Sequence, residues 1–297
     1  PFKGFPADKA GLKSGDEIIK IGEITLLDNE GDASELLKGA ANSKVKITYL
    51  RQGKTETTTL TRGAIDVHAV PFFQLINDDI GYIVLSKFNR KTTTETKAAL
   101  EDLKLQGATK IILDLRGNPG GLLTEAINVV NLFVPKGATI VTTKSAIKKY
   151  NKTYKTQKPA FDSEIPLVVL VNGRSASASE IVSGALQDLD RAVIIGSRSF
   201  GKGLVQRPKP LSYGTQLKVT ISRYFTPSGR CIQALDYKKR DENGQAIRVR
   251  EENYNSFKTK NGRAVFDGGG VMPDIELTES DISEFTKDII KQNFVFN

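Results

Sequence analysis

A chain of 297 residues is long for a single hydrophobic core, so two domains are expected. Its hydrophobic fraction of 39% and charged fraction of 26% are typical of a globular protein and exclude a disordered or fibrous one. The net charge of +9 comes from lysines and arginines scattered along the chain, and we interpret it as a solvated basic surface because no nucleic-acid-binding motif accompanies it.

The first 62 residues predict a small β-rich unit. A turn cluster at residues 11–16 precedes an alternation of apolar and polar residues, which is the pattern of a half-buried strand. The expected elements are strands at 17–21, 45–50 and 55–60 and a short helix at 32–37.

From about residue 80 the pattern changes to strands that alternate with helices. Strands are predicted at 80–85, 110–115, 139–143, 167–171 and 192–196, and helices at 92–105, 122–133 and 179–189. Because these strands are rich in Val, Ile and Leu, they predict a largely buried parallel sheet. A site in such a sheet is expected at the carboxyl ends of the strands, in the strand-to-helix loops.

The rest of the chain predicts a β-extension at 203–234, a long polar loop at 235–265 and a final helix near 280–292. No apolar stretch reaches about 18 residues, so no transmembrane helix is expected. The sequence has no signal peptide and does not begin with methionine, which we interpret as truncation and which leaves room for a removed export signal. The single cysteine, Cys231, excludes an internal disulfide and a cysteine-rich zinc site, and we interpret it as structural.

Two strand-to-helix loops stand out. The first, Asp-Leu-Arg-Gly-Asn-Pro-Gly-Gly at 114–121, places glycines at a helix N-terminus, where backbone N–H groups can approach a ligand and favour negative charge. Such a loop can supply part of an oxyanion hole, or it can be a plain glycine-rich turn. It matches no nucleotide-binding motif.

The second loop, at 172–180, contains three serines between a strand and a helix. A small nucleophile is favoured at such a turn. Ser177 and Glu180 also have the Ser-x-x-Glu spacing of a helix capping box, and this segment alone favours the cap.

A nucleophilic serine needs a base. A Ser-His-Asp triad would have to use the only histidine, His68, which precedes the parallel sheet and has the context of a packing or surface residue. The other candidate is Lys202, which follows a predicted strand and stands between two glycines. A lysine acts as a base only in its neutral form, which burial in an apolar site favours.

Two segments carry a resemblance to a known family. Ser-Ala-Ser-Ala-Ser-Glu at 175–180 and Phe-Gly-Lys-Gly-Leu-Val-Gln at 200–206 resemble the carboxyl-terminal processing (tail-specific) serine peptidases, peptidase family S41. The loop at 114–121 is similar to a third block of that family, and residues 6–19 are similar to the PDZ domain that these enzymes carry. The resemblance covers nearly the whole chain.

This resemblance implies a serine–lysine dyad. In the family the nucleophile precedes the lysine by 25 positions, which pairs Ser177 with Lys202 (202 − 25 = 177) and selects it over Ser175 and Ser179. A glutamine four residues after the lysine orients it in several members, which implies that role for Gln206. The other implied residues are Ala178 with Gly120 or Gly121, whose backbone N–H groups form the oxyanion hole, and Asp188 as structural support.

The implied fold is α/β: a crotonase/Clp protease-like sheet-and-helix catalytic core at 63–297, with its β-extension and polar loop around 203–265. It follows a PDZ domain at 1–62 that is incomplete, because its early strands and its carboxylate-binding loop are absent. That departure from the family pattern puts PDZ-mediated substrate capture in doubt for this chain.

The implied function is endopeptidase cleavage of proteins or peptides near a free carboxyl terminus, through an acyl-enzyme and with no metal or cofactor. The segments at 226–233 and 268–274 resemble those of envelope-located bacterial members, which implies the periplasm or cell envelope. No nucleic-acid partner is expected. The alternatives are a non-catalytic PDZ-type peptide-binding scaffold and a crotonase-like acyl-CoA enzyme, and the intact set of Ser177, Lys202 and Gln206 argues against both.

Overall fold

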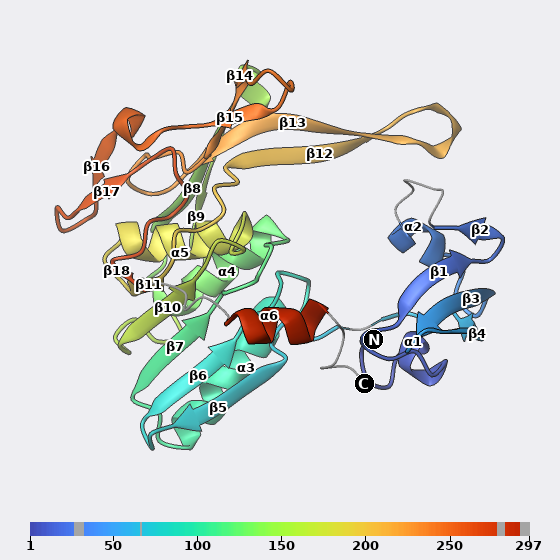
Figure 1. Ribbon diagram of the computed structural model, residues 1–297. Coiled ribbons are helices and arrows are strands. Elements are labelled where there is room, and N and C mark those ends of the chain that lie inside the picture. The colour runs from blue at the N-terminus through green and yellow to red at the C-terminus, as the bar shows by residue number, and fades with distance from the viewer. Residues whose placement is uncertain (27–32, 66, 278–282, 292–297) are drawn as a thin grey trace. The chain divides into compact units, whose positions relative to one another are not determined.

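The computed structural model describes residues 1–26, 33–65, 67–277 and 283–291. The chain forms two compact units (Figure 1). One combines residues 1–67 with the C-terminal segment that contains helix α6 (Glu284–Lys291), and the other spans residues 68–279. The ends of the predicted helix near 280–292 lie outside the described residues.

The N-terminal unit is built on a four-stranded antiparallel sheet in the order β2-β1-β3-β4. Its elements are α1 (Pro6–Lys9), β1 (Glu17–Ile21), β2 (Ile24–Thr25), α2 (Ala33–Leu37), β3 (Lys44–Arg51) and β4 (Lys54–Thr61). Alternation along β3 buries Val45, Ile47 and Tyr49 on one face. The three predicted strands are confirmed, and the predicted helix is confirmed from residue 33 onward, because residue 32 lies outside the described part.

The second unit contains a six-stranded sheet in the order β18-β11-β10-β7-β6-β5. Its strands are β5 (Phe72–Ile76), β6 (Ile80–Val84), β7 (Lys110–Asp114), β10 (Leu167–Val171), β11 (Val193–Gly196) and β18 (Ile275–Glu276). All neighbours pair in parallel except β5, which is antiparallel to β6 and has no counterpart among the predicted strands. The mixed α/β fold is therefore confirmed.

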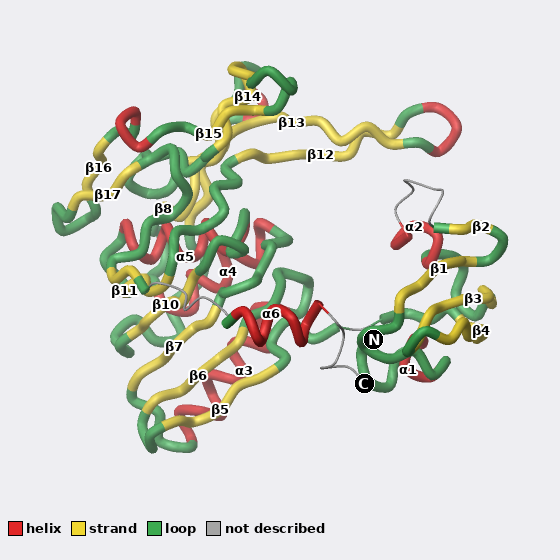
Figure 2. Tube along the Cα trace, viewed as in Figure 1, coloured by secondary structure: helices red, strands yellow, loops and turns green. Residues whose placement is uncertain are grey.

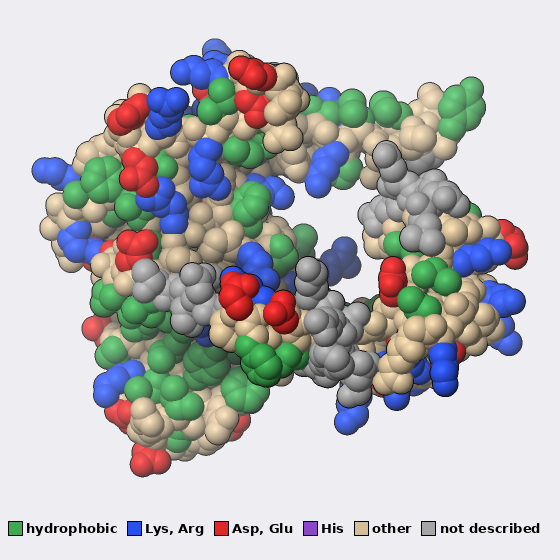
Figure 3. Space-filling model, viewed as in Figure 1, with side chains coloured by type: hydrophobic (Ala, Val, Ile, Leu, Met, Phe, Trp, Pro, Cys, Tyr) green, Lys and Arg blue, Asp and Glu red, His purple; other side chains and the backbone are tan. Residues whose placement is uncertain are grey.

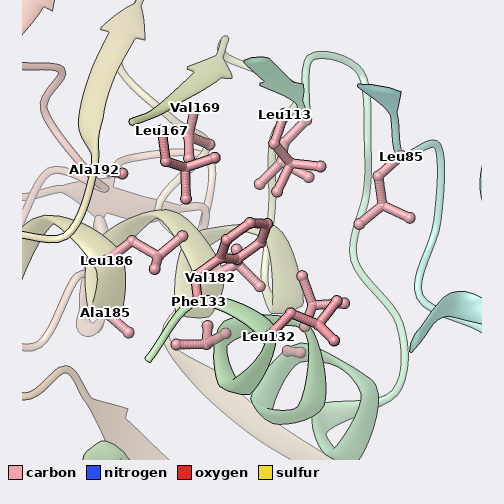
Figure 4. Packing of buried hydrophobic residues seen from close by; sticks show 14 of the residues in the cluster. Leu85, Leu113, Leu132, Phe133, Leu167, Val169, Val182, Ala185, Leu186 and Ala192 are labelled. Atoms are coloured by element: carbon pink, nitrogen blue, oxygen red, sulfur yellow. The ribbon is translucent and has the colours of Figure 1, made fainter. Parts of the chain in front are cut away.

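The main core lies between this sheet and its helices, which are α3 (Thr92–Leu105), α4 (Leu123–Phe133) and α5 (Ala178–Asp188). Figure 4 shows Leu113 and Val169 of the sheet facing Phe133 and Val182 of the helices. The prediction of a largely buried sheet holds for this face only. On the opposite face, alternate residues of β10 are only half-buried. The apolar runs in the sequence of these strands therefore do not mean that both faces of the sheet are covered.

A second sheet in the order β12-β13-β8-β9 consists of β8 (Thr139–Lys144), β9 (Lys152–Lys155), β12 (Leu204–Pro210) and β13 (Gln216–Phe225). All its neighbours pair antiparallel, so the strand predicted at 139–143 exists as β8 but does not belong to the parallel sheet as expected. The β12–β13 hairpin projects as a long arm (Figure 2). The predicted long loop at 235–265 is wrong. That segment forms two small hairpins, β14 (Leu235–Arg240) with β15 (Ala246–Arg248) and β16 (Ser256–Lys258) with β17 (Ala264–Phe266), whose short and largely exposed strands give no apolar period.

Short 3-10 turns complete the described structure: η1 (Lys148–Tyr150), η2 (Ser212–Gly214) and η3 (Glu251–Asn253). Lys and Arg side chains are interspersed with Asp and Glu on the face of the second unit shown in Figure 3. Within the residues that the structure describes, no helix is both long and apolar enough to cross a membrane.

Candidate active site

Ser177 occupies a strained turn between β10 and α5. It is the N-cap residue of α5, with φ 56° and ψ −108°. An N-cap residue normally has an extended backbone, and residues other than glycine rarely adopt a positive φ. The predicted capping box with Glu180 is present, but a cap alone does not explain this conformation. A strained serine at a sharp strand-to-helix turn is the geometry of a nucleophile elbow.

Burial separates Ser177 from its two neighbours. Ser175 and Ser179 are fully buried, and their hydroxyl groups donate to the carbonyl oxygens of Leu115 (2.8 Å) and Asn118 (2.9 Å). Both hydroxyls therefore tie the serine turn to the glycine loop that follows β7. Ser177 is half-buried, and it is the one serine of the three whose hydroxyl does not donate to the glycine loop.

The glycine loop packs directly against the serine turn because β7 and β10 are parallel neighbours. Gly120 has φ 98°, and a Cβ added there would lie 2.6 Å from Ala176 O, 2.8 Å from Ala178 N and 2.9 Å from Ser177 Cβ. No side chain fits at that distance, so the approach requires glycine.

Three backbone N–H groups were predicted as oxyanion donors. The N–H of Gly120 donates to Asn118 Oδ1 at 2.9 Å. The N–H groups of Gly121 and Ala178 have no acceptor among the described residues. In this conformation the donors that remain open are therefore those of Gly121 and of Ala178, at the N-terminus of α5.

Glu180 connects the serine turn to the lysine loop. Its fully buried carboxylate accepts from the N–H groups of Ser177 (2.8 Å) and Lys202 (2.9 Å) on one oxygen, and from Ser199 Oγ (2.6 Å) and Gly201 N–H (2.7 Å) on the other. Burial raises the pKa of the Glu180 carboxyl group, while the four hydrogen bonds act in the opposite direction.

Tyr224, on β13, completes the connection. Its buried hydroxyl donates to the carbonyl oxygen of Ser177 at 3.2 Å and contacts that of Lys202. Burial, followed by the charge of Glu180, raises the pKa of Tyr224 well above its usual value, so the hydroxyl stays a donor. Ser177 and Lys202 are thus each held at their N–H and at their carbonyl. We call Glu180 and Tyr224 the backbone clamp.

The sequence prediction missed the backbone clamp. Glu180 carried a signal, but one that indicated a helix cap, and Tyr224 carried none because its partners are 22 and 47 residues away. Such contacts depend on how β13 crosses the lysine loop, which no local pattern reports.

Lys202 is half-buried, and its ammonium group makes no hydrogen bond or ion pair with any described residue. Gln206, predicted to orient it, is exposed and approaches Thr220 Oγ1 at 3.5 Å; no hydrogen bond joins the side chains of Gln206 and Lys202. Both residues line a cavity of about 580 Å³ that includes Ala176, next to Ser177. The orienting role of Gln206 stays a prediction.

Comparison with known proteins identifies the family of the chain. The model of peptidase family S41 matches residues 79–239, and a PDZ domain model matches residues 3–61. The chain belongs to peptidase family S41.

Its similar proteins include a carboxy-terminal-processing protease of Bartonella bacilliformis, 40% identical over 245 residues, and the carboxy-terminal processing protease CtpA of Bacillus subtilis, 38% identical over 236 residues. These matches cover 79% and 78% of this chain but 55% and 50% of the relatives, so the chain spans about half their length. The solved photosystem II D1 C-terminal processing protease is 31% identical, with a TM-score of 0.56, over 96% of this chain and 68% of that one.

In this S41 peptidase, Asp188 lies at the far end of α5 from Ser177. It forms a fully buried ion pair with Arg230 (2.8 Å) and accepts from the N–H of Ser228 (2.9 Å). The pair joins the end of α5 to the turn after β13, and it contacts neither Ser177 nor Lys202.

The remaining candidates of this S41 peptidase lie elsewhere. His68 is exposed and pairs with Glu95 at 3.0 Å, beside α3, so the structure does not bring it to Ser177. Cys231 is half-buried, and burial raises the pKa of its thiol. Within the described part of the chain, no group of His, Cys, Asp and Glu side chains gathers as a metal site.

Proposed function

We propose that this chain is a serine endopeptidase that cleaves proteins or peptides near their carboxyl terminus, with Ser177 as nucleophile and Lys202 as base. The observation that carries the proposal is that one buried carboxylate oxygen of Glu180 holds the backbone of both residues while Ser177 adopts a strained turn. The names of the relatives support it, and the activity, substrates and partners of the whole protein belong to this proposal.

The reaction is acyl transfer. Neutral Lys202 takes the proton of Ser177 Oγ, which attacks the carbonyl carbon of the scissile peptide. The open N–H groups of Ala178 and Gly121 receive the developing oxyanion, and the N-terminus of α5 adds its favourable field. The proton then passes to the leaving amine, and water hydrolyses the ester with Lys202 again as base. Gln206 orients the lysine on one wall of the cavity, and Asp188 supports α5.

The two-domain division belongs to the same proposal, with a PDZ domain at 1–62 and the catalytic core at 63–297. It differs from the two compact units of the structure, which group the C-terminal segment that contains α6 with residues 1–67. We place the enzyme in the periplasm or cell envelope of a bacterium. Support comes from its bacterial CtpA-type relatives and from its resemblance to envelope-located members in the segments after β13 and β17.

A serine-directed fluorophosphonate probe tests this function. We expect stoichiometric labelling of Ser177, slowed by a peptide with a free, apolar carboxyl end. The label should be absent from Ser177→Ala and retained by Ser212→Ala, a serine at the exposed tip of the β12–β13 hairpin. A peptide-binding scaffold or a crotonase-like acyl-CoA enzyme would stay unlabelled, and that result would overturn the proposal.

The backbone clamp gives a second prediction. Tyr224→Phe keeps the buried ring but removes the donor to the carbonyls of Ser177 and Lys202. The carbonyl of Ser177 keeps the N–H donors of Glu180 (2.9 Å) and Ile181 (3.0 Å). The carbonyl of Lys202, by contrast, is left without a donor among the described residues. Leaving such an acceptor without a partner costs about 1–3 kcal/mol, so we expect kcat to fall about tenfold or more with little change in KM. Steady-state kinetics measure this.

Tyr49→Phe, which loses a hydroxyl contact to Glu56 in the N-terminal unit, is the control, and equal kinetics of the two variants would contradict the clamp.

A further inference from the structure

The cavity beside the dyad has walls of a distinct chemistry. It is lined by apolar side chains from two segments: Phe200 and Leu204 around Lys202, and Leu235 and Tyr237 at the start of β14. Phe200 and Tyr237 are about half exposed, so both side chains present apolar surface at the cavity that a ligand can cover.

The charged side chains that line the cavity are all of one sign. The described lining residues include two cations, Arg174 and Lys202, and no carboxylate. Lys202 is assigned to proton transfer, which leaves Arg174 as the fixed positive charge. The guanidinium group of Arg174 is exposed and makes no hydrogen bond or ion pair with any described residue. By contrast, the guanidinium group of Arg198 is paired with Glu251.

Arg174 also stands at a defined place. It lies three residues before Ser177, and its backbone N–H donates to Asn172 Oδ1, the same oxygen that accepts from Gly117 N–H. The side-chain amide of Asn172 thus connects the backbone of Arg174 to the glycine loop. The serine turn and Arg174 are therefore both held against that loop.

We propose that this cavity is a substrate subsite for an apolar residue accompanied by a carboxylate, and that Arg174 binds the carboxylate. The proposal rests on the endopeptidase function above and adds a specificity determinant to it. A guanidinium group matches a carboxylate with two parallel N–H···O bonds, and an apolar floor beside it strengthens them. The carboxylate comes either from the substrate's terminus or from an acidic side chain.

Binding is measured on the Ser177→Ala variant, so that hydrolysis does not intervene. Three fluorescent peptides share one apolar sequence: one ends in a free carboxylate, one in an amide, and one in an amide after an added Asp. We expect the free acid to bind about 10- to 100-fold more tightly than the plain amide, the range of a charge-assisted hydrogen bond. Tight binding of the Asp peptide would assign the site to acidic side chains.

Adding Arg174→Gln isolates this cavity from any carboxylate site in the N-terminal unit. The preference for carboxylate is expected to fall to near one with Arg174→Gln and to persist with Arg207→Gln, an exposed arginine on β12 outside the cavity. Equal binding of acid and amide, or a preference that survives Arg174→Gln, overturns the proposal. In the enzyme with Ser177 intact, cleavage of acid and amide at equal rates refutes only this inference, whereas cleavage of neither peptide refutes the endopeptidase function.

Discussion

Ser177→Ala is expected to lower kcat on a peptide with a free, apolar carboxyl end by about 10⁴- to 10⁶-fold. The substitution removes the only hydroxyl of the serine turn that is not donated to the glycine loop. Lys202→Ala is expected to cost about as much, because the hydroxyl is a weak nucleophile without its base. The double variant should be no worse than either single one, since residues that act as a unit are not additive.

Single-turnover and steady-state assays on the purified variants measure these losses. Lys209→Ala, an exposed lysine on the same strand as Gln206, is the control for loss of a positive charge and should retain kcat. In the parent enzyme kcat/KM should rise toward alkaline pH, because a lysine base acts only when neutral. Cleavage retained by Ser177→Ala or by Lys202→Ala would refute the dyad.

Asp188→Asn is expected to lower the free energy of unfolding of the second unit by about 3–5 kcal/mol. Asp188 and Arg230 are both fully buried, and burial alone already lowers the pKa of Arg230 because it disfavours the charge. Removing the carboxylate charge leaves a buried guanidinium group uncompensated, which costs far more than an exposed pair would.

Urea unfolding measures the loss, with Asp102→Asn on the exposed side of α3 as the control. The double variant Asp188→Leu/Arg230→Met should recover most of the stability, since a well-packed apolar pair can replace a buried ion pair. Where the single variant is still folded, its kcat should match that of the parent, because the pair does not contact the dyad. A large loss of kcat with unchanged stability would contradict the structural role.

Much of the fold could be predicted because its strands and helices carry clear periods. The helix expected at 92–105 has those bounds, and the two loops singled out do meet at the carboxyl ends of β7 and β10. The choice of Ser177 among three serines could not be made locally, because the three share one context in sequence. What separates them is that Ser175 and Ser179 are buried against a loop 60 residues away.

The elements and contacts that could not be predicted from the sequence have a common cause. The strands β14 and β15 show no alternation between core and surface, and β16 and β17 are three residues long with only the central residue turned inward, which is too short to give a period in the sequence. The backbone clamp and the Asp188–Arg230 pair are polar contacts across long stretches of chain, and their partners are fixed by tertiary packing. The periodicity of a sequence indicates which faces of its helices and strands are apolar. It gives no information on which buried polar groups contact each other.

The conformation of Ser177 sets stability and catalysis against each other. A residue with a side chain at such a φ and ψ stores about 1–3 kcal/mol, a sizeable part of the roughly 5–15 kcal/mol by which folded domains are stable. Glycine would relieve that strain at position 177 and would also delete the proposed nucleophile. Selection for heat resistance alone would therefore favour loss of the hydroxyl. Under the proposed function, selection for hydrolysis is what opposes that loss and keeps a serine at this position.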